Sequence, residues 1–368
     1  MLVGEFPKEQ DLVKSEPFAG GIGFELGKML AEAGIHRETC FATYVVDDRV
    51  SGGNLAGLVA ESKAKATSAH TLFHGKYVTP QFVAGVERLK REIELVKPNV
   101  VCAMGNLALL ALTGEWSAMS WRSSIMESTL VPGLKVIPTY SPAMVVAQMY
   151  LRPITVHDLK RVAKHRDNPV IERPNYDFRI RPNFEQACED LQLIIDLPAQ
   201  DIGGDIETRA GHIACIAFAW TPRDAICIPL MCQHDNEGYW TLEQETTLVL
   251  LMLTLMRKHR IVGQNWNYDA QYIYRHWHFL CPNVSDTMIA HHSCFSNMEK
   301  NLAFLSSMYL DDHLYWKDDR TNWDTGPKGE GENLGRPEGA RRVRGHGRSA
   351  PHRRLHHRGP GVRPGRIP

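Results

Sequence analysis

The alternation of short apolar runs with longer amphipathic runs is the feature that most constrains the fold. In residues 1–166 these runs follow one another as 24–33 (helical), 41–46 (strand-like), 83–96 (helical), 99–104 (strand-like), 134–137 (strand-like) and 144–164 (helical). Such alternation predicts a mostly parallel sheet covered by helices on both faces. Functional residues of these sheets lie on the loops that follow the strand ends.

A second unit begins after a break at residues 167–183, which carry three prolines and no periodicity and are predicted to be a linker. The pattern that follows predicts helices at 184–196, 242–258, 268–277 and 287–295, and strands at 202–208, 212–220, 225–230 and 260–263. Three successive strands followed by alternating elements indicate an α/β unit with a mixed sheet. We therefore expect two domains, at 1–166 and 184–324.

The charge distribution sets a third segment apart. The formal net charge is zero, yet residues 325–368 hold one Lys and ten Arg against three Glu, whereas residues 172–324 hold 12 basic and 22 acidic groups. Gly, Arg, Pro and His make up 30 of the last 44 residues, which leaves too little apolar surface to offset ordering. We predict a disordered basic tail, and because GC-rich genes often give Gly and Arg in the wrong frame, we hypothesise a frame-shifted reading.

Several classes of protein are excluded by what the sequence lacks. No window approaches ~18 uncharged apolar residues, so no membrane span is predicted. The eight cysteines form no CxxC pair, which indicates reduced core thiols and no iron–sulfur cluster. These features are typical of a cytoplasmic protein.

Acidic residues mark the second unit. Asp205 and Glu207 are two residues apart on a predicted strand and therefore lie on the same face. Carboxylates so placed repel one another unless a cation lies between them, and Mg²⁺ or Mn²⁺ takes such ligands readily. Another carboxylate, Asp269, follows a buried strand within the run Asn265-x-x-Tyr268-Asp269, and Asp286 comes later.

This order of motifs resembles the DnaQ-like (DEDD) 3′–5′ exonucleases, closest to the proofreading domain of family A DNA polymerases. The resemblance implies a ribonuclease H-like fold in which Asp205, Glu207 and Asp269 hold two metal ions. It also implies that Asn265 anchors the second-motif loop beside the substrate, while we interpret Asp286 as structural. The third motif of the family, Tyr-x-x-x-Asp, has a counterpart in letters only at 315–319, in a polar stretch without helical periodicity. The alternative for the whole set is a helix cap and a surface pair of carboxylates.

The first unit carries four short motifs in order, at 3–23, 98–108, 120–123 and 138–143, and all but the third contain glycine or proline. Together they resemble the uracil-DNA glycosylase superfamily, in particular family 4 and its version at the N-terminus of phage family A DNA polymerases. The resemblance implies a three-layer α/β fold and a pocket for a flipped base. By position, Phe18 stacks on the base, Glu5 positions the attacking water, and Trp121 and Arg122 contact the DNA backbone.

Two positions depart from that family. Tyr44 stands where the family has an Asn that reads uracil, and Ser141 stands where it has a His that stabilises the developing charge. Both are still predicted to contact the substrate. Loss of one positioned hydrogen-bond donor typically slows a reaction by about 10²–10³. Two functions therefore stay open for this unit: glycosylase activity, and DNA binding or base sensing without it.

We therefore interpret the chain as part of a phage-type DNA polymerase, a replication and repair protein. It would join a uracil-DNA-glycosylase-like domain to a Mg²⁺- or Mn²⁺-dependent 3′–5′ exonuclease that acts on single-stranded 3′ ends of DNA. Uracil-containing DNA is a further expected partner, and no membrane is. Two alternatives stay open: a standalone DEDD exoribonuclease, and a non-enzymatic DNA-binding remnant.

Overall fold

The computed structural model describes residues 1–60, 62–232 and 238–316. The predicted tail at 325–368, with its frame-shift hypothesis, lies outside these residues, as does Asp319 of the candidate third motif. Within the described ranges, no helix combines the length and the apolar character needed to cross a membrane.

The first unit is built on a five-stranded sheet with the strand order β2-β1-β6-β8-β7. All neighbouring pairs are parallel except β7 with β8, which is antiparallel. The strands are β1 (Leu2–Gly4), β2 (Ala42–Tyr44), β6 (Val100–Met104), β7 (Met126–Glu127) and β8 (Lys135–Thr139). The carboxyl ends of β1, β2, β6 and β8 therefore meet at one edge, where the motif loops begin.

Helices cover both faces of this sheet. They are α1 (Glu9–Lys14), α2 (Gly20–Glu32), α3 (Pro80–Val96), α4 (Asn106–Thr113), α5 (Ala118–Trp121), α6 (Pro142–Ala147) and α7 (Arg152–His165). Alternate residues of β6 enter two separate hydrophobic clusters, one containing α3 and α4 and the other α2 and α7. The predicted three-layer α/β fold is confirmed.

A small antiparallel sheet lies beside the first unit and was not predicted. Its strand order is β3-β5-β4, formed by β3 (Val59–Ala60), β4 (Thr71–Phe73) and β5 (Lys76–Val78). Each of these strands is only two or three residues long. No period can be read from so short a run, so the sequence pattern does not predict this sheet.

The second unit holds a six-stranded mixed sheet with the order β14-β13-β10-β11-β12-β9. Its strands are β9 (Asp177–Ile180), β10 (Asp201–Arg209), β11 (His212–Ala219), β12 (Asp224–Pro229), β13 (Arg260–Gly263) and β14 (Val284–Asp286). The β10–β11 and β11–β12 pairs are antiparallel, and the other pairs are parallel. The predicted mixed sheet is confirmed.

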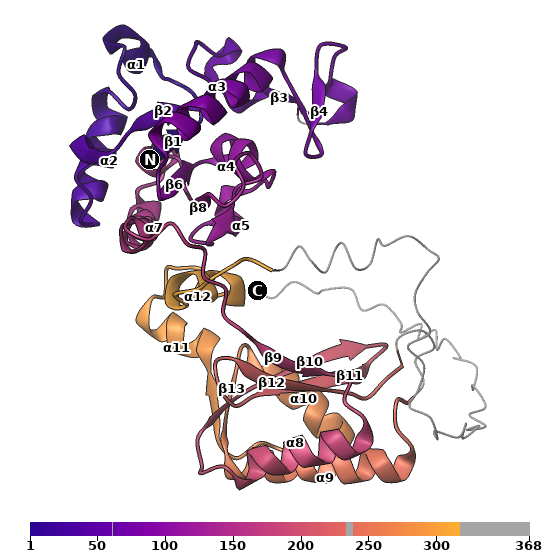
Figure 1. Ribbon diagram of the computed structural model, residues 1–368. Coiled ribbons are helices and arrows are strands. Elements are labelled where there is room, and N and C mark those ends of the chain that lie inside the picture. The colour runs from indigo at the N-terminus through magenta and orange to yellow at the C-terminus, as the bar shows by residue number, and fades with distance from the viewer. Residues whose placement is uncertain (61, 233–237, 317–368) are drawn as a thin grey trace, which may run out of the picture.

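The helices of the second unit are α8 (Phe184–Asp196), α9 (Leu242–Lys258), α10 (Trp266–Trp277) and α11 (Thr287–Cys294). The packed pair α8 and α9 covers one face of the sheet (Figure 1) and shares one hydrophobic cluster with its inward-facing residues. The first two helices and β13 match the predicted ranges residue for residue.

Two segments differ from the predicted domain boundaries. The expected linker at 167–183 contains β9, which is the edge strand of the second sheet. The backbone of β9 is hydrogen-bonded to β12, and this pairing makes the segment a strand. The sequence pattern of the segment alone does not predict it. Helix α12 (Leu302–Tyr309) was expected in the second domain, yet Phe304 and Leu305 are buried in the α2–α7 cluster of the first unit.

Candidate functional site

The carboxylate pair of the second unit lies on β10. Ile202 and Ile206 point into the core against α8 and α9, so Asp205 and Glu207 project together from the opposite face and are exposed. Partial desolvation by the surrounding residues raises the pKa of Asp205, and the neighbouring Glu207 raises it further. The structure therefore places both carboxylates on the common face that the sequence predicted.

Asp269 approaches the same strand from α10. Its carboxylate is 3% exposed, and its Oδ1 accepts a hydrogen bond of 2.9 Å from the backbone N–H of Ile206, the residue between the two acidic ones. Burial raises the pKa of Asp269 to about 6, and the charge of Asp205 adds to the shift. The three carboxylates therefore lie close enough to influence one another.

The residues fit a divalent cation by the chemistry of their donors. Three carboxylates supply hard oxygen ligands. Burial is the main reason that the pKa values of Asp205 and Asp269 are raised, and the neighbouring carboxylates add to both shifts, a repulsion that a cation would relieve. Among the described residues, however, no three acidic, His or Cys side chains converge into a ready-made metal cluster. One oxygen of Asp269 is already engaged by the Ile206 N–H, which accounts for the open arrangement.

Asp286 holds the start of α10 in place. Its carboxylate accepts from the backbone N–H groups of Asn265 and Trp266, at 3.1 and 2.8 Å, and also caps α11 through Met288. The structural role predicted for Asp286 agrees with this arrangement. Asn265 itself is exposed and adopts a left-handed backbone (φ 58°), so its own backbone forms the turn that brings α10 to β10.

The candidate third motif does not reach these carboxylates through Tyr315. The Tyr315 ring packs edge-on against Trp121 of the first unit, with 5.1 Å between the ring centroids, and its backbone N–H donates to Ser124. The described residues therefore bring three of the four expected carboxylates to β10. His291 of α11 is 5% exposed, and its Nδ1 lies 2.9 Å from the Tyr309 hydroxyl.

In the first unit, Glu5 follows β1 at the carboxyl edge of the sheet. Its Oε1 accepts a 3.1 Å hydrogen bond from the backbone N–H of Leu107, in the first turn of α4. A side chain on Gly105 would lie 2.5 Å from the Glu5 carboxyl carbon, so glycine is required there for this approach. Burial raises the pKa of Glu5, although the Leu107 hydrogen bond opposes the shift.

Tyr44 fills the space next to Glu5. Its hydroxyl accepts from the Phe18 N–H and donates to Asp11 Oδ2, both at 2.8 Å, and the Phe18 and Tyr44 ring centroids are 4.8 Å apart. The three residues are 8% exposed or less. A Cβ on Gly4 would come within 2.8 Å of both rings, so the rings rest directly on the β1 backbone. Phe18 therefore packs at a tilt of 46° against a side chain of its own protein, whereas it was predicted to stack on a base.

The predicted pocket exists but is small. Glu5, Phe18, Tyr44 and Ser141 all line one cavity, as the sequence predicted, and its volume is about 30 Å³. This equals the share of one water molecule in the liquid and does not admit a nucleobase. Ser141 caps α6 through its Oγ, which accepts from the Met144 N–H at 3.3 Å.

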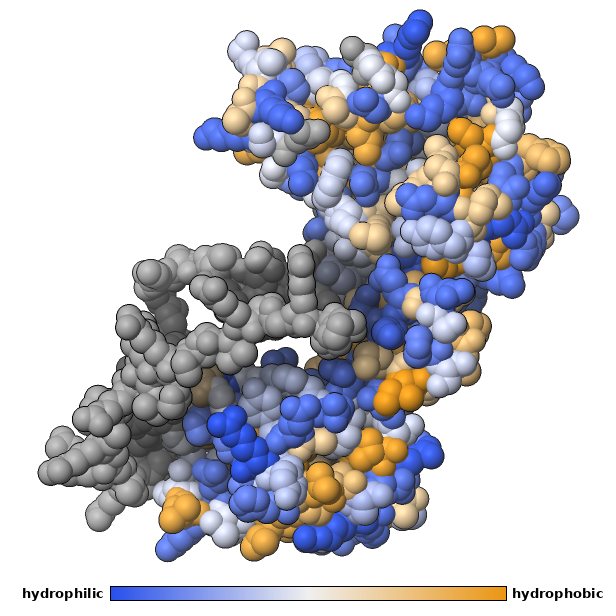
Figure 2. Space-filling view, turned by 180° about the vertical axis from the view of Figure 1, so that it is seen from behind, coloured by the Kyte–Doolittle hydropathy of each residue, from blue (hydrophilic) through white to orange (hydrophobic). Residues whose placement is uncertain are grey.

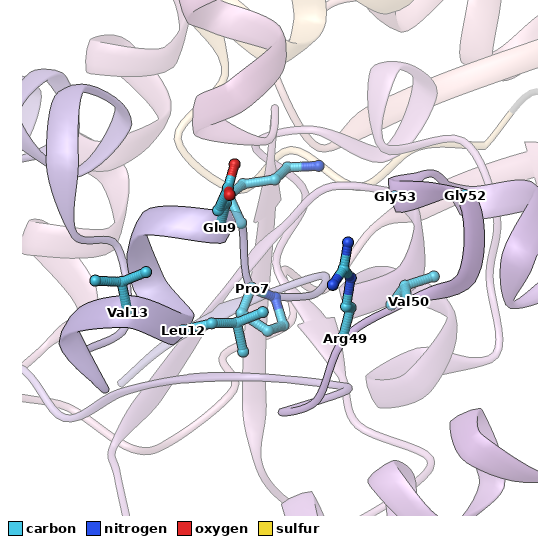
Figure 3. Close-up of a pocket in the computed structure, with 9 residues that line it drawn as sticks. Pro7, Glu9, Leu12, Val13, Arg49, Val50, Gly52 and Gly53 are labelled. Atoms are coloured by element: carbon cyan, nitrogen blue, oxygen red, sulfur yellow. The ribbon is translucent and has the colours of Figure 1, made fainter.

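A larger pocket of about 800 Å³ opens beside this cavity and shares Lys8 with it. Its residues come from α1 and from the loop after β2, and Figure 3 shows Glu9 and Arg49 reaching into it from opposite sides. Leu12 and Val13 supply an apolar wall on the α1 side. Open space at this edge of the sheet therefore lies outside the cavity that Tyr44 fills.

The roles predicted for Trp121 and Arg122 need correction. Arg122 is 1% exposed, and its guanidinium forms two hydrogen bonds to the carboxylate of Asp158 and one to the Ser307 hydroxyl. Trp121 lies under Tyr315. Neither side chain is available to a DNA backbone, because α12 and the residues after it occupy this surface.

Two carboxylates that bind predicted site residues were not identified from the sequence. Asp11, which fixes Tyr44, also accepts from the N–H groups of Lys8 and Ala19, at 2.7 and 2.6 Å. Asp158 binds both Arg122 and the Thr139 hydroxyl. Asp158 lies on the mostly apolar buried face of α7. Because an Asp is almost never buried without a partner, its position was a sequence signal for a buried partner such as Arg122.

Comparisons with known proteins agree with both units. The model of the uracil DNA glycosylase superfamily matches residues 1–160, and a 3′-5′ exonuclease model matches residues 183–332. The type-4 uracil-DNA glycosylase of Archaeoglobus fulgidus is 26% identical over 45% of this chain and 75% of its own length. That of Thermotoga maritima is 25% identical over 44% of this chain and 74% of its own length.

Solved structures similar in part include the catalytic core of RRP6 from Trypanosoma brucei, with 15% identity over 41% of this chain and a TM-score of 0.30. Escherichia coli RNase D, an exoribonuclease, has 16% identity over 43% of this chain and a TM-score of 0.31. The chain spans 39% of the length of each. By the two family models, the chain joins a uracil-DNA glycosylase-like domain to a domain similar to the DEDD 3′-5′ exonucleases, and both kinds of domain belong to nucleic-acid processing.

Proposed function

We propose that this protein is a divalent-metal-dependent 3′–5′ exonuclease that removes nucleotides from single-stranded DNA ends. The observation that carries the proposal is that Asp205 and Glu207 share the exposed face of β10 while Asp269 of α10 accepts a hydrogen bond from the Ile206 N–H between them. The domain also matches a 3′-5′ exonuclease family in sequence. The raised pKa of Asp269 supports it, because a carboxyl that is shifted by burial and by a neighbouring carboxylate is typical of functional sites.

The mechanism follows from what each side chain does. Asp205, Glu207 and Asp269 would hold Mg²⁺ or Mn²⁺, which lowers the pKa of a bound water and stabilises charge on the phosphate and the leaving oxygen. The Ile206 N–H holds the Asp269 carboxylate toward β10. The Asp286 carboxylate accepts from the Trp266 N–H and so holds the first turn of α10 in position. The Tyr268 hydroxyl is 2.6 Å from Thr208 Oγ1, which links α10 to the end of β10 and limits its movement.

For the first domain we propose DNA binding without uracil excision. The Tyr44 ring occupies the cavity, its hydroxyl is anchored by Asp11, and the about 30 Å³ that is left does not admit a base. Glu5 keeps a raised pKa, but it has no room to place a water beside a sugar. A 5′-labelled duplex with one uracil, incubated with excess protein and then with alkali, is expected to stay intact. Strand breaks at the uracil position would contradict this assignment.

The polymerase context is part of the same proposal. Its support is the order of the two domains, which resembles the N-terminal part of phage family A DNA polymerases, and it implies action in the cytoplasm of a bacterium or infected host. The standalone exoribonuclease is the competing function. Matched DNA and RNA oligonucleotides of one sequence distinguish the two, and we expect faster release from DNA.

The exonuclease is tested by the products of a 5′-labelled single-stranded 20-mer incubated with Mg²⁺. A ladder that shortens stepwise from the 3′ end, lost with EDTA and restored by excess Mg²⁺, is the expected result. A matched oligonucleotide with a blocked 3′ hydroxyl and a 3′ phosphorothioate linkage should resist. Internal cuts, or release that persists in EDTA, would rule out the proposed function.

A further inference from the structure

The face of the second sheet that carries the catalytic carboxylates is open beyond them. Residues opposite one another in register form two rows across it, one running Asp205, Ala217, Cys227 and Ile180 and the other Gly203, Ala219, Ala225 and Phe178. The interior members of both rows are small side chains. The opposite face of the same strands is packed against α8 and α9. The result is a shallow floor that leads from the carboxylates to the edge strand β9.

Two aromatic rings stand at the far side of this floor. Tyr176 and Phe178 are stacked, with 4.8 Å between their ring centroids and 21° between their planes. They are 44% and 57% exposed, and the neighbouring Ile180 is 71% exposed. Three exposed apolar side chains at one edge leave apolar surface in water, and such a patch commonly marks a binding site.

The distance from the carboxylates to these rings suits an extended strand. Strand β9 lies three spacings of about 4.8 Å from β10, and Phe178 and Tyr176 lie two and four residues along from the row of Asp205. The rings are therefore roughly 16–20 Å from Asp205. A few nucleotides of single strand span this length. Flat aromatic rings stack on any base, and such contacts are sequence-tolerant, as a nuclease that degrades arbitrary ends requires.

We propose that Tyr176 and Phe178 form a base-stacking subsite for the single-stranded nucleic acid whose 3′ end lies at Asp205, which rests on the proposed exonuclease function. The subsite holds a nucleotide upstream of the bond to be cut. The floor of Ala217, Ala219 and Ala225 leaves room for the intervening sugar and phosphate groups. Neither ring touches the reacting atoms, so both are positioning residues.

The test uses oligodeoxynucleotides that carry 2-aminopurine at each of the last six positions in turn. Its fluorescence falls when it stacks, and binding is measured in EDTA so that nothing is cleaved. For the wild-type chain we expect quenching at one or two positions upstream of the 3′ end. Phe178→Ala is expected to lose this quenching and to bind about 5- to 150-fold more weakly. Phe178→Trp is expected to restore both.

The matched control is Phe24→Ala, which removes an equally exposed phenylalanine (68%) from α2 of the first domain. It is expected to bind and quench as the wild type does. With Mg²⁺, Phe178→Ala should raise KM and leave kcat within about two-fold. Unchanged quenching and KM in a folded Phe178→Ala chain, or equal losses in the control, would overturn the subsite. If the wild type released no nucleotide while the quenching persisted, the exonuclease proposal would fail and the stacking site would stand.

Discussion

At the scale of single residues, Tyr44 determines how much space the cavity of the first domain has. The sequence showed that an Asn of the family was replaced, but not that the larger ring would turn inward and bind Asp11. That outcome depends on Phe18 and Asp11 being brought to the same edge by the loop after β1, which no local pattern encodes. The predicted pocket residues therefore lie together, and the Tyr44 ring occupies the space between them.

Removing only the hydroxyl of Tyr44 measures this network. Tyr44→Phe leaves the buried Phe18 N–H without its partner and removes one of the two hydrogen bonds that Asp11 Oδ2 accepts. We therefore expect the free energy of unfolding to fall by about 1–3 kcal/mol. Urea unfolding provides the measurement. Tyr150→Phe removes a hydroxyl from a 68% exposed side chain and should change the stability by less than about 0.5 kcal/mol. Equal losses in the two variants would show that the network contributes nothing.

At the scale of elements, long periodic segments were predicted well and short ones were not. The predicted bounds of α8 and α9 match exactly because each has a capping box at its start and a continuous apolar face. Strand β9 was read as linker, since prolines flank it and only its pairing with β12 makes it a strand. The carboxylates of β10 were predicted because the strand period alone puts them on one face, whereas the position of α10 depends on Asp286.

Asp286 is expected to matter more than an ordinary helix cap. Asp286→Ala removes the acceptor for the start of both α10 and α11, so we expect a loss of about 2–3 kcal/mol in unfolding free energy. Asn183→Ala, which removes only the cap of α8, should cost about 1 kcal/mol. Denaturant melts of both variants give the comparison. A loss no larger than that of Asn183→Ala would contradict the bracing role.

At the scale of the whole molecule, the chain returns to the first domain after the second. Residues 298–316, the return segment, bury Phe304 against α2 and α7 and receive hydrogen bonds from Arg122 and Arg161 (Figure 1). The surface of Figure 2 shows the two domains joined through a narrower described region. Because the second domain is tied to the first at both of its ends, we expect the two domains to unfold cooperatively.

The return segment should respond to acid. His313 is 2% exposed, neither ring nitrogen has a partner, and burial followed by the charges of Arg161 and Arg122 lowers its pKa to about 4. A histidine held neutral in the fold contributes stability above pH 6.5 that is lost as the pH falls toward 4. We expect hydrogen exchange of α12 to accelerate over this window. His313→Gln should reduce that pH dependence, whereas the exposed His36→Gln should not; identical profiles would contradict the assignment.

The central claim is that the carboxylates of β10 perform the chemistry, and the rate of nucleotide release by Asp205→Ala tests it most directly. The control is Asp196→Ala, which removes an acidic residue at the end of α8. With Mg²⁺ and a 5′-labelled single strand, we expect at least a 10²-fold loss in Asp205→Ala, by analogy with the loss of one electrostatic catalytic group, and none in the control. Both variants should melt as the wild type does. Release by a folded Asp205→Ala chain at the wild-type rate would contradict the claim.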